Sequence, residues 1–213
     1  MDSPDTLSAA LARHGIELPE EQIAELDRYC LRLWDWNARL NLTRHTDYER
    51  FVSRDVVDSL WLERFLESGE RVLDVGTGGG VPGVVLAIVR PDLAVALCDS
   101  VAKKARAVAA IVEEAGLKIP VHHAAAQDLL EGHRFDTLVL RAVAPLPKLL
   151  TWFNPHWDDF GRLLLIKGPA WTEERAACRE RRLLQGLRLS KLAAYPLPGT
   201  NSESVVLQIR RDE

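Results

Sequence analysis

Apolar residues in the first 70 positions recur at intervals of three or four, which is the spacing of one face of an α-helix. Glycine and proline divide this stretch: Gly15 ends a first helix, Pro19 opens a second and Gly69 ends a third. Thr46 and Glu49 have the spacing of a capping box at the start of the third helix. The apolar positions that define the three faces are Leu7 and Leu11, then Ile23, Leu26, Cys30, Leu33 and Leu40, then Phe51, Val52, Val56, Leu60 and Phe65.

The pattern changes after Gly69, where short apolar runs alternate with helical segments. Ser100 can cap a helix that runs to Glu114, and Gly116 follows its end. We predict strands at 71–75, 93–98, 120–124, 137–140, 163–166, 187–194 and 204–209, with helices at 82–89, 101–114 and 173–185.

Strands that alternate with helices indicate a parallel sheet with helices on both faces. The C-terminal end lacks a helix between its strands, so the last strand is expected to return antiparallel. The sequence therefore predicts an α/β fold with a seven-stranded, mostly parallel, Rossmann-like sheet. We expect an N-terminal helical extension at 1–69 and a core at 70–213, which together form one compact unit.

Composition narrows the class of protein. The chain is 47% hydrophobic and 27% charged with a net charge of −4, which is ordinary globular usage and argues against disorder. It contains no apolar run long enough to span a membrane, and its first 15 residues include acids and no long apolar block, which argues against a secretory signal. Cys30, Cys98 and Cys178 lie far apart and form no CxxC motif. We expect a cytoplasmic protein without a disulfide framework.

The strongest chemical signal is the run Asp74-Val75-Gly76-Thr77-Gly78-Gly79-Gly80-Val81-Pro82-Gly83, between a predicted strand and a predicted helix. Glycines there permit positive φ and let a ligand approach the backbone closely. Ligands of open α/β sheets bind outside the carboxyl ends of the strands. We therefore expect the main binding site at this turn.

Two classes of ligand fit the turn. Gly78, Gly80 and Gly83 satisfy the dinucleotide spacing GxGxxG, and an acid follows at Asp99. However, no second domain remains to hold a hydride-transfer substrate, and no phosphate-binding Lys-Ser/Thr follows the glycines. A second register, acid-x-Gly-x-Gly-x-Gly from Asp74, resembles the motif of class I S-adenosylmethionine-dependent methyltransferases. That resemblance implies that Asp99 accepts hydrogen bonds from the ribose hydroxyls of the cofactor.

Further motifs narrow the resemblance. They are Trp36-Asn37, Asn41-Leu42-Thr43, Asp58-Ser59, the glycine-rich run, Leu97-Cys98-Asp99-Ser100 with Lys103-Lys104, Arg141-Ala142-Val143-Ala144 and Lys167-Gly168. In this order they resemble the glucose-inhibited division protein B family, bacterial enzymes that methylate guanine N7 in 16S ribosomal RNA. The resemblance implies S-adenosylmethionine as cofactor and 16S ribosomal RNA or the small ribosomal subunit as partner.

The turn and the resemblance together imply seven cofactor-binding residues. They are Gly76, Gly78, Val81, Asp99, Ala126, Gln127 and Arg141. The chain departs from the family twice: the family commonly has His where Asp55 stands, and an acid where Gln127 stands. The second departure matters less if position 127 holds adenine through its backbone N–H. The first leaves the role of the side chain at 55 open.

Guanine N7 is a lone pair that faces the major groove and carries no proton. Methyl transfer to N7 therefore needs no general base, and catalysis should come from approach and orientation. The candidate positioning residues are Arg141 and Lys167, which follow the fourth and fifth strands, and Asn41 and Asp58 on the extension, accompanied by Thr43 and Ser59. A structural arginine at the strand end, and a helix cap or brace at Asp58-Ser59, are the alternatives.

Two basic stretches interrupt a mildly acidic chain. Residues 28–54 hold six arginines and three acids, and residues 162–191 hold eight basic residues and three glutamates. Each stretch is either a solvated face or a footprint for an anionic polymer. Arg32 and Arg39 lie a heptad apart on one side of the second helix. The tryptophans at helical spacing are expected to pack in the core rather than to stack on RNA.

Alternatives in other functional classes stay open on sequence alone. A class I methyltransferase that acts on a small molecule or a protein has the same fold, because fold does not set the substrate. A non-catalytic RNA-binding protein that senses the cofactor is the other alternative. The six histidines are scattered, so we expect no metal site. We also expect a monomer, and the sequence leaves open whether the substrate is naked RNA, an assembling subunit or the ribosome.

Overall fold

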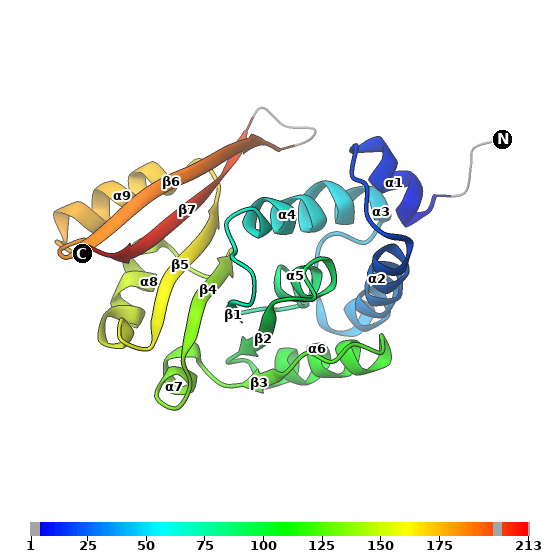
Figure 1. Cartoon of the computed structure of the whole chain (residues 1–213), viewed down its shortest axis with the longest axis horizontal. Coiled ribbons are helices and arrows are strands. Elements are labelled where there is room, and N and C mark those ends of the chain that lie inside the picture. The colour runs from blue at the N-terminus through cyan, green and yellow to red at the C-terminus, as the bar shows by residue number, and fades with distance from the viewer. Residues whose placement is uncertain (1–4, 198–201, 213) are drawn as a thin grey trace.

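A seven-stranded sheet forms the centre of the computed structural model, which describes residues 5–197 and 202–212 (Figure 1). The strands are β1 (Arg71–Val75), β2 (Ala94–Asp99), β3 (Val121–His123), β4 (Phe135–Arg141), β5 (Phe160–Lys167), β6 (Leu187–Pro196) and β7 (Glu203–Arg211). Their order is β3-β2-β1-β4-β5-β7-β6. Neighbours among β1 to β5 pair in parallel, and β7 runs antiparallel to both β5 and β6. The predicted fold class is confirmed.

Helices connect the strands and form the N-terminal part of the chain. They are α1 (Leu7–Arg13), α2 (Glu20–Leu40), α3 (Tyr48–Arg50), the π-helix η1 (Phe51–Val56), α4 (Val57–Glu63), α5 (Gly83–Val89), α6 (Ala102–Glu114), α7 (Ala126–Leu130), α8 (Leu146–Phe153), the 3₁₀-helix η2 (Asn154–His156) and α9 (Trp171–Glu180). The sequence pattern did not predict α7 and α8, which are short. It also extended the last helix to residue 185, whereas α9 ends before Arg182, whose φ of 56° is left-handed.

Two predicted helix caps are wrong. The third helix is capped by Asp47, whose carboxylate accepts from the Arg50 N–H at 2.8 Å, and not by Thr46 and Glu49. Ser100 does not cap α6: the N-cap position is Val101, and no side chain caps the helix. The neighbouring Asp99 accepts the Val101 N–H at 2.8 Å. At the third helix a carboxylate next to the expected hydroxyl takes the backbone donor, and charged acceptors form the stronger hydrogen bonds.

Alternate residues of the strands point to opposite faces, and each face has its own hydrophobic cluster. Val72 packs in a cluster with Leu33 of α2 and Val84 of α5, so the extension and the sheet share one core. Leu73 packs on the other face with Leu149 of α8 and Cys178 of α9. All three cysteines are buried and free. None of the helices in the described residues has the length and apolar character needed to cross a membrane.

The chain leaves β1 for β2 on one side and later returns to β4 on the other side of β1. Such a switch point leaves a crevice at the carboxyl ends of the strands, where ligands bind in open α/β sheets. The glycine-rich turn follows β1 at this point (Figure 1).

Asp74, in β1, holds the glycine-rich turn in place through its side chain. Its Oδ2 accepts hydrogen bonds from Thr77 Oγ1 at 2.6 Å and from the Gly83 N–H at 2.9 Å. Gly83 leaves room for this arrangement, since a Cβ there would lie 2.2 Å from Leu97 Cδ2 and 2.7 Å from Asp74 Cβ. The other carboxylate oxygen, Oδ1, is buried and has no partner among the described residues. Burial raises the pKa of Asp74 to about 6 in spite of its two donors.

Replacing Asp74 by Asn should flatten the dependence of stability on pH between about pH 4 and 6. The folded-state pKa of Asp74 lies above its ordinary value of 3.8. Its contribution to the free energy of unfolding is therefore fully present below about pH 4 and is lost as the pH rises through about 6. The Asn oxygen can still accept from Thr77 and Gly83, and its amide nitrogen replaces the unpartnered oxygen.

The measurement is urea unfolding of both proteins from pH 4 to 7.5, and the informative quantity is the difference between them, because other carboxylates titrate in both. The expected change in that difference is at most about 3 kcal/mol, since a raised pKa corresponds to about 1.4 kcal/mol for each pH unit between the two states. Parallel curves would contradict the assignment of a raised pKa to Asp74.

Candidate functional site

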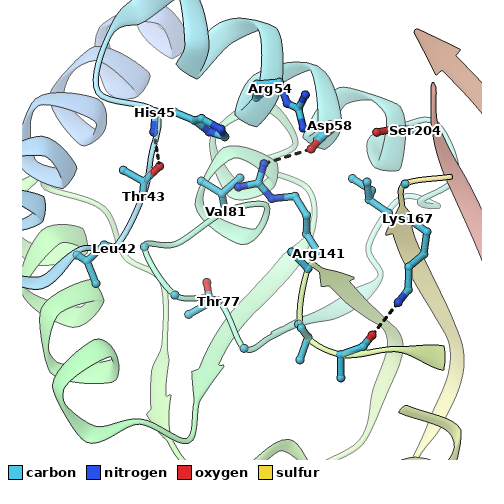
Figure 2. Close-up of a pocket in the computed structure, with 18 of the residues that line it drawn as sticks. Leu42, Thr43, His45, Arg54, Asp58, Thr77, Val81, Arg141, Lys167 and Ser204 are labelled. Carbon is cyan, nitrogen blue, oxygen red and sulfur yellow. Dashed lines mark hydrogen bonds and ion pairs between the residues drawn. The ribbon is translucent and has the colours of Figure 1, made fainter. Parts of the chain in front are cut away.

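A cavity of about 680 Å³ lies at the carboxyl edge of the sheet, beside the glycine-rich turn (Figure 2). Five parts of the chain form its walls: the turn, the segment after β4, the end of β5 with α9, the extension and the C-terminal hairpin. Residues that line it include Thr43, His45, Arg54, Asp58, Gly76, Gly78, Val81, Arg141, Lys167, Glu174 and Ser204. The expected binding site at the turn is thus a cavity, and it brings together Gly76, Gly78, Val81, Arg141, Asp58 and Lys167.

The turn presents backbone rather than side chains to the cavity. Gly76 and Gly78 have φ of 66° and 60°, which side-chain-bearing residues rarely adopt. A Cβ on Gly78 would meet only the Gly76 carbonyl oxygen, at 3.9 Å, so the space beside it is open. From behind, Tyr29 Oη of α2 donates to the Gly79 carbonyl at 2.8 Å. The turn is therefore held rigidly with an accessible face.

Asp99, Ala126 and Gln127 are not among the residues that line the cavity. Asp99 is 5% exposed, and its two oxygens accept the Gly78 N–H at 3.1 Å and the Val101 N–H at 2.8 Å. Each carboxylate oxygen retains a second lone pair. Asp99 thus supports the turn directly, while Ala126 and Gln127 begin α7 beyond the end of β3.

Arg141 ends β4 and is held by two carboxylates of the extension, of which Figure 2 shows Asp58. Its Nη2 lies 2.7 Å from Asp55 Oδ1, and its Nη1 donates to Asp58 Oδ2 at 3.2 Å. Asp55 is fully buried in η1, and Asp58 is 4% exposed in α4. Arg141 is therefore both a cavity-lining residue and part of a buried ion-pair cluster. The role of position 55, which the sequence left open, is to pair with Arg141.

Two further side chains complete this cluster. His45 Nδ1 lies 2.9 Å from Asp55 Oδ1, and Tyr195 Oη donates to Asp58 Oδ1 at 2.6 Å. Tyr195 comes from β6 and stacks on Trp61 with ring centroids 4.9 Å apart. The C-terminal hairpin thus reaches the wall of the cavity. Of the two alternatives for Ser59, a pocket residue or a helix brace, the structure shows the brace. Its Oγ donates to the Asp55 carbonyl at 2.7 Å.

The loop after α2 borders the same cavity. Asn41 adopts a left-handed φ of 48° and ends α2, and Asn37 Oδ1 accepts the Thr43 N–H at 2.8 Å. A second hollow of about 550 Å³ is lined by this loop and Arg141. Because Thr43, His45 and Arg141 line both hollows, the predicted residue Asn41 borders an extension of the main cavity.

Lys167 closes the far side of the cavity, at the end of β5. Its Nζ donates to the Ala144 carbonyl at 2.7 Å and to Glu174 Oε2 of α9 at 2.8 Å. The described residues contain no group of three or more His, Cys, Asp or Glu side chains that could hold a metal ion.

The sequence reasoning missed His45, Glu174 and Tyr195 as site residues. His45 had a usable signal, because it stands two residues after the Asn41-Leu42-Thr43 motif. Glu174 and Tyr195 had none, since α9 reads as an ordinary charged helix and β6 as an edge hairpin strand. Their roles depend on where the fold places α9 and β6.

Comparison with known proteins identifies relatives over most of the chain. The family model of rRNA small subunit methyltransferase G, GidB, matches residues 22–197. Ribosomal RNA small subunit methyltransferase G of Rhodopirellula baltica is 48% identical over 188 residues, which are 88% of this chain and 81% of that protein. The protein of the same name from Chromobacterium violaceum is 37% identical over 92% of both chains.

Solved structures agree on the fold. TrmK of M. capricolum, in complex with S-adenosyl-homocysteine, has a TM-score of 0.58 at 10% identity and covers 73% of this chain and 68% of that chain. A mutant of MtNAS in complex with S-adenosylmethionine has a TM-score of 0.58 at 17% identity and covers 100% of this chain and 86% of that chain. At these identities the likeness extends to the fold alone. Given the family match over residues 22–197 and the 48% identity to a curated relative, the chain belongs to the GidB family of rRNA small subunit methyltransferases G.

Proposed function

We propose that this protein transfers a methyl group from S-adenosylmethionine to N7 of a guanine in the ribosomal RNA of the small subunit. The observation that carries this proposal is the cavity in which the glycine-rich turn of a GidB family member faces Arg141 and Lys167. The similar proteins are named ribosomal RNA small subunit methyltransferases, and these names support ribosomal RNA as the substrate class. The resemblance of the motifs to the glucose-inhibited division protein B family supports guanine N7 as the acceptor.

The residues around the turn fit S-adenosylmethionine. The side of Gly78 that faces the cavity is open, and a cavity of about 680 Å³ adjoins it. When bound, the cofactor supplies a methyl group carried on a positively charged sulfur. The residues that would hold it are Gly76, Gly78, Val81, Asp99, Ala126, Gln127 and Arg141, with Asp99 directed to the ribose hydroxyls through its remaining lone pairs.

The acceptor nitrogen has no proton to lose, so the site needs orientation more than proton transfer. Arg141 is immobilised by Asp55 and Asp58, and a guanidinium fixed in this way can direct a reactant without rearranging. Asn41, Asp58 and Lys167 are the other positioning residues that we propose on the acceptor side. Methyl transfer forms the N7–carbon bond as the sulfur–carbon bond breaks, and the positive charge passes from sulfur to the guanine ring.

RNA contacts are expected on the extension. Arg54 lines the main cavity and Arg44 the adjoining one, and Arg32 and Arg39 are exposed on α2. An RNA strand that delivers a base to the cavity would pass these side chains. We further propose that the protein acts as a monomer in the cytoplasm, where its RNA substrate resides.

Nucleoside mass spectrometry of 16S ribosomal RNA tests the function. RNA from cells that lack the protein should have one 7-methylguanosine fewer, and purified protein with S-adenosylmethionine should restore it in isolated small subunits. Methyl label in a protein or a small molecule would favour a different methyltransferase substrate. Binding of cofactor and RNA without any transfer would favour a non-catalytic RNA-binding protein.

Asp99→Ala should weaken binding of S-adenosylmethionine by roughly ten- to a hundredfold, because hydrogen bonds to a charged acceptor contribute about 1.5–3 kcal/mol. Isothermal titration calorimetry measures the affinity. Glu113→Ala, an exposed acid on α6, is the matched control, and thermal unfolding verifies that the turn survives without the Asp99 hydrogen bond to Gly78. A loss of affinity smaller than about threefold would contradict the assignment of Asp99 to the ribose hydroxyls.

Replacing Arg32 and Arg39 together by Ala should reduce the salt dependence of RNA binding. Every phosphate that the protein no longer neutralises lowers the slope of log affinity against log salt by about one, so the expected decrease is at most about two. The measurement is a titration of small subunits at several salt concentrations, with S-adenosylhomocysteine present to prevent turnover. Arg179→Ala with Arg188→Ala, exposed residues of α9 and β6, is the control pair. If the slope stays unchanged in the first double variant and falls in the control double variant, the RNA binds the basic stretch at 162–191 instead.

A further inference from the structure

Lys167 and Glu174 form a donor–acceptor pair in the wall of the cavity. Lys167 Nζ and Glu174 Oε2 lie 2.8 Å apart, and their side chains are 12% and 21% exposed. Both residues line the cavity, on the side where β5 and α9 meet, and Figure 2 shows the Lys167 ammonium turned toward the segment after β4. The pair is therefore held at the cavity rather than on the outer surface.

The hydrogen bonds of the pair leave one donor and one acceptor free. A lysine ammonium has three N–H donors, and Lys167 uses one on the Ala144 carbonyl and one on Glu174. Glu174 Oε2 accepts from Lys167 and from the Leu146 N–H at 2.7 Å. Within the described residues, Glu174 Oε1 has no hydrogen bond. The backbone contacts to Ala144 and Leu146 fix the orientation of both side chains.

A free donor beside a free acceptor matches one edge of guanine. On the Watson–Crick edge of guanine the acceptor O6 adjoins the donor N1–H, whereas adenine reverses this order with the donor N6–H₂ and the acceptor N1. Enzymes that modify a base commonly read a flipped-out base through hydrogen bonds to this edge. Contact on this edge also leaves N7 free to receive the methyl group.

We propose that Lys167 and Glu174 read the Watson–Crick edge of the target guanine, with Lys167 donating to O6 and Glu174 accepting from N1–H. This assignment rests on the proposed function and names the residues that select guanine over adenine. The contact to Glu174 also favours the reaction. Methylation at N7 places a positive charge on the ring, N1–H becomes more acidic, and its hydrogen bond to a carboxylate becomes stronger in the transition state than in the ground state.

The test measures single-turnover methyl transfer to reconstituted small subunits that carry either guanine or adenine at the target position. It compares the wild-type protein with Glu174→Gln, and Glu173→Gln, an exposed neighbour on α9, is the control. The intrinsic reactivity of each base is the same for every variant, so a change in the guanine-to-adenine ratio isolates the contribution of the protein.

We expect Glu174→Gln to slow transfer to guanine by roughly ten- to a hundredfold, the typical effect of one hydrogen bond to a charged group. Transfer to adenine should not slow, because the Gln amide can present an N–H donor to the acceptor N1 that the carboxylate opposes. The subunit concentration at half-saturation should hardly move, since RNA contacts outside the cavity set it. Glu173→Gln should match the wild-type protein. Equal slowing on both bases, or no slowing, would overturn the proposal and leave the pair as a brace between β5 and α9.

A second arm needs no variant and so does not depend on the folding of Glu174→Gln. The wild-type protein is given subunits with inosine, which keeps O6 and N1–H, or with 2-aminopurine, which lacks both, at the target position. Inosine should react within about threefold of guanine and 2-aminopurine at least roughly tenfold more slowly, as expected when a site loses its hydrogen-bonding partner. Similar rates for the two analogues would overturn the proposal. Failure to form any 7-methylguanosine from guanine would instead refute the proposed function.

Discussion

The ion pair between Arg141 and the carboxylates of Asp55 and Asp58 joins the parts of the chain that surround the cavity. Arg141 ends the central strand β4, both carboxylates come from the helical extension, and Tyr195 of the C-terminal hairpin donates to Asp58. All three parts contribute residues to the walls of the cavity, together with the glycine-rich turn and the end of β5 with α9. Any movement of the extension or of the hairpin relative to the sheet would break a charged hydrogen bond in a buried place. The shape of the cavity therefore depends on this contact.

Such a cluster contributes little to net stability. Removing two carboxylates and a guanidinium from water costs several kcal/mol for each ion in typical proteins, and their mutual attraction about offsets that cost. Here Asp55 Oδ2 has no partner in the described structure, and Ala142, next to Arg141, has a left-handed φ of 55°. With Asp74 Oδ1 and Arg54 Nε, three of the four buried side-chain atoms that lack a partner among the described residues lie around one cavity, and the fourth is Trp157 Nε1. Unpaired polar atoms and strained backbone commonly gather at binding sites, where they lower local stability but fix the geometry of the site.

Local sequence was sufficient to predict the strand–glycine–helix unit, because each of its signals lies within ten residues of Asp74. It was not sufficient for the partners of Arg141. The contact from Arg141 to Asp58 spans 83 positions and that from Tyr195 to Asp58 spans 137, and no periodicity encodes contacts over such separations. The family resemblance did not help at Asp55 either, because the sequence departs at this position from the pattern that the resemblance implies. The pairing of Asp55 with both Arg141 and His45 follows from the three-dimensional arrangement alone.

The two halves of the cavity suit the two demands of the proposed reaction. In the proposed reaction the backbone groups of the turn would hold the cofactor, and these groups carry no proton that is lost near neutral pH. On the acceptor side, Asp55 and Asp58 already accept from Arg141, which makes them poor candidates for a base but good supports for orientation. The proposed reaction moves a positive charge from sulfur to guanine without a proton transfer, so the acceptor side has to hold the base in position rather than to supply a base.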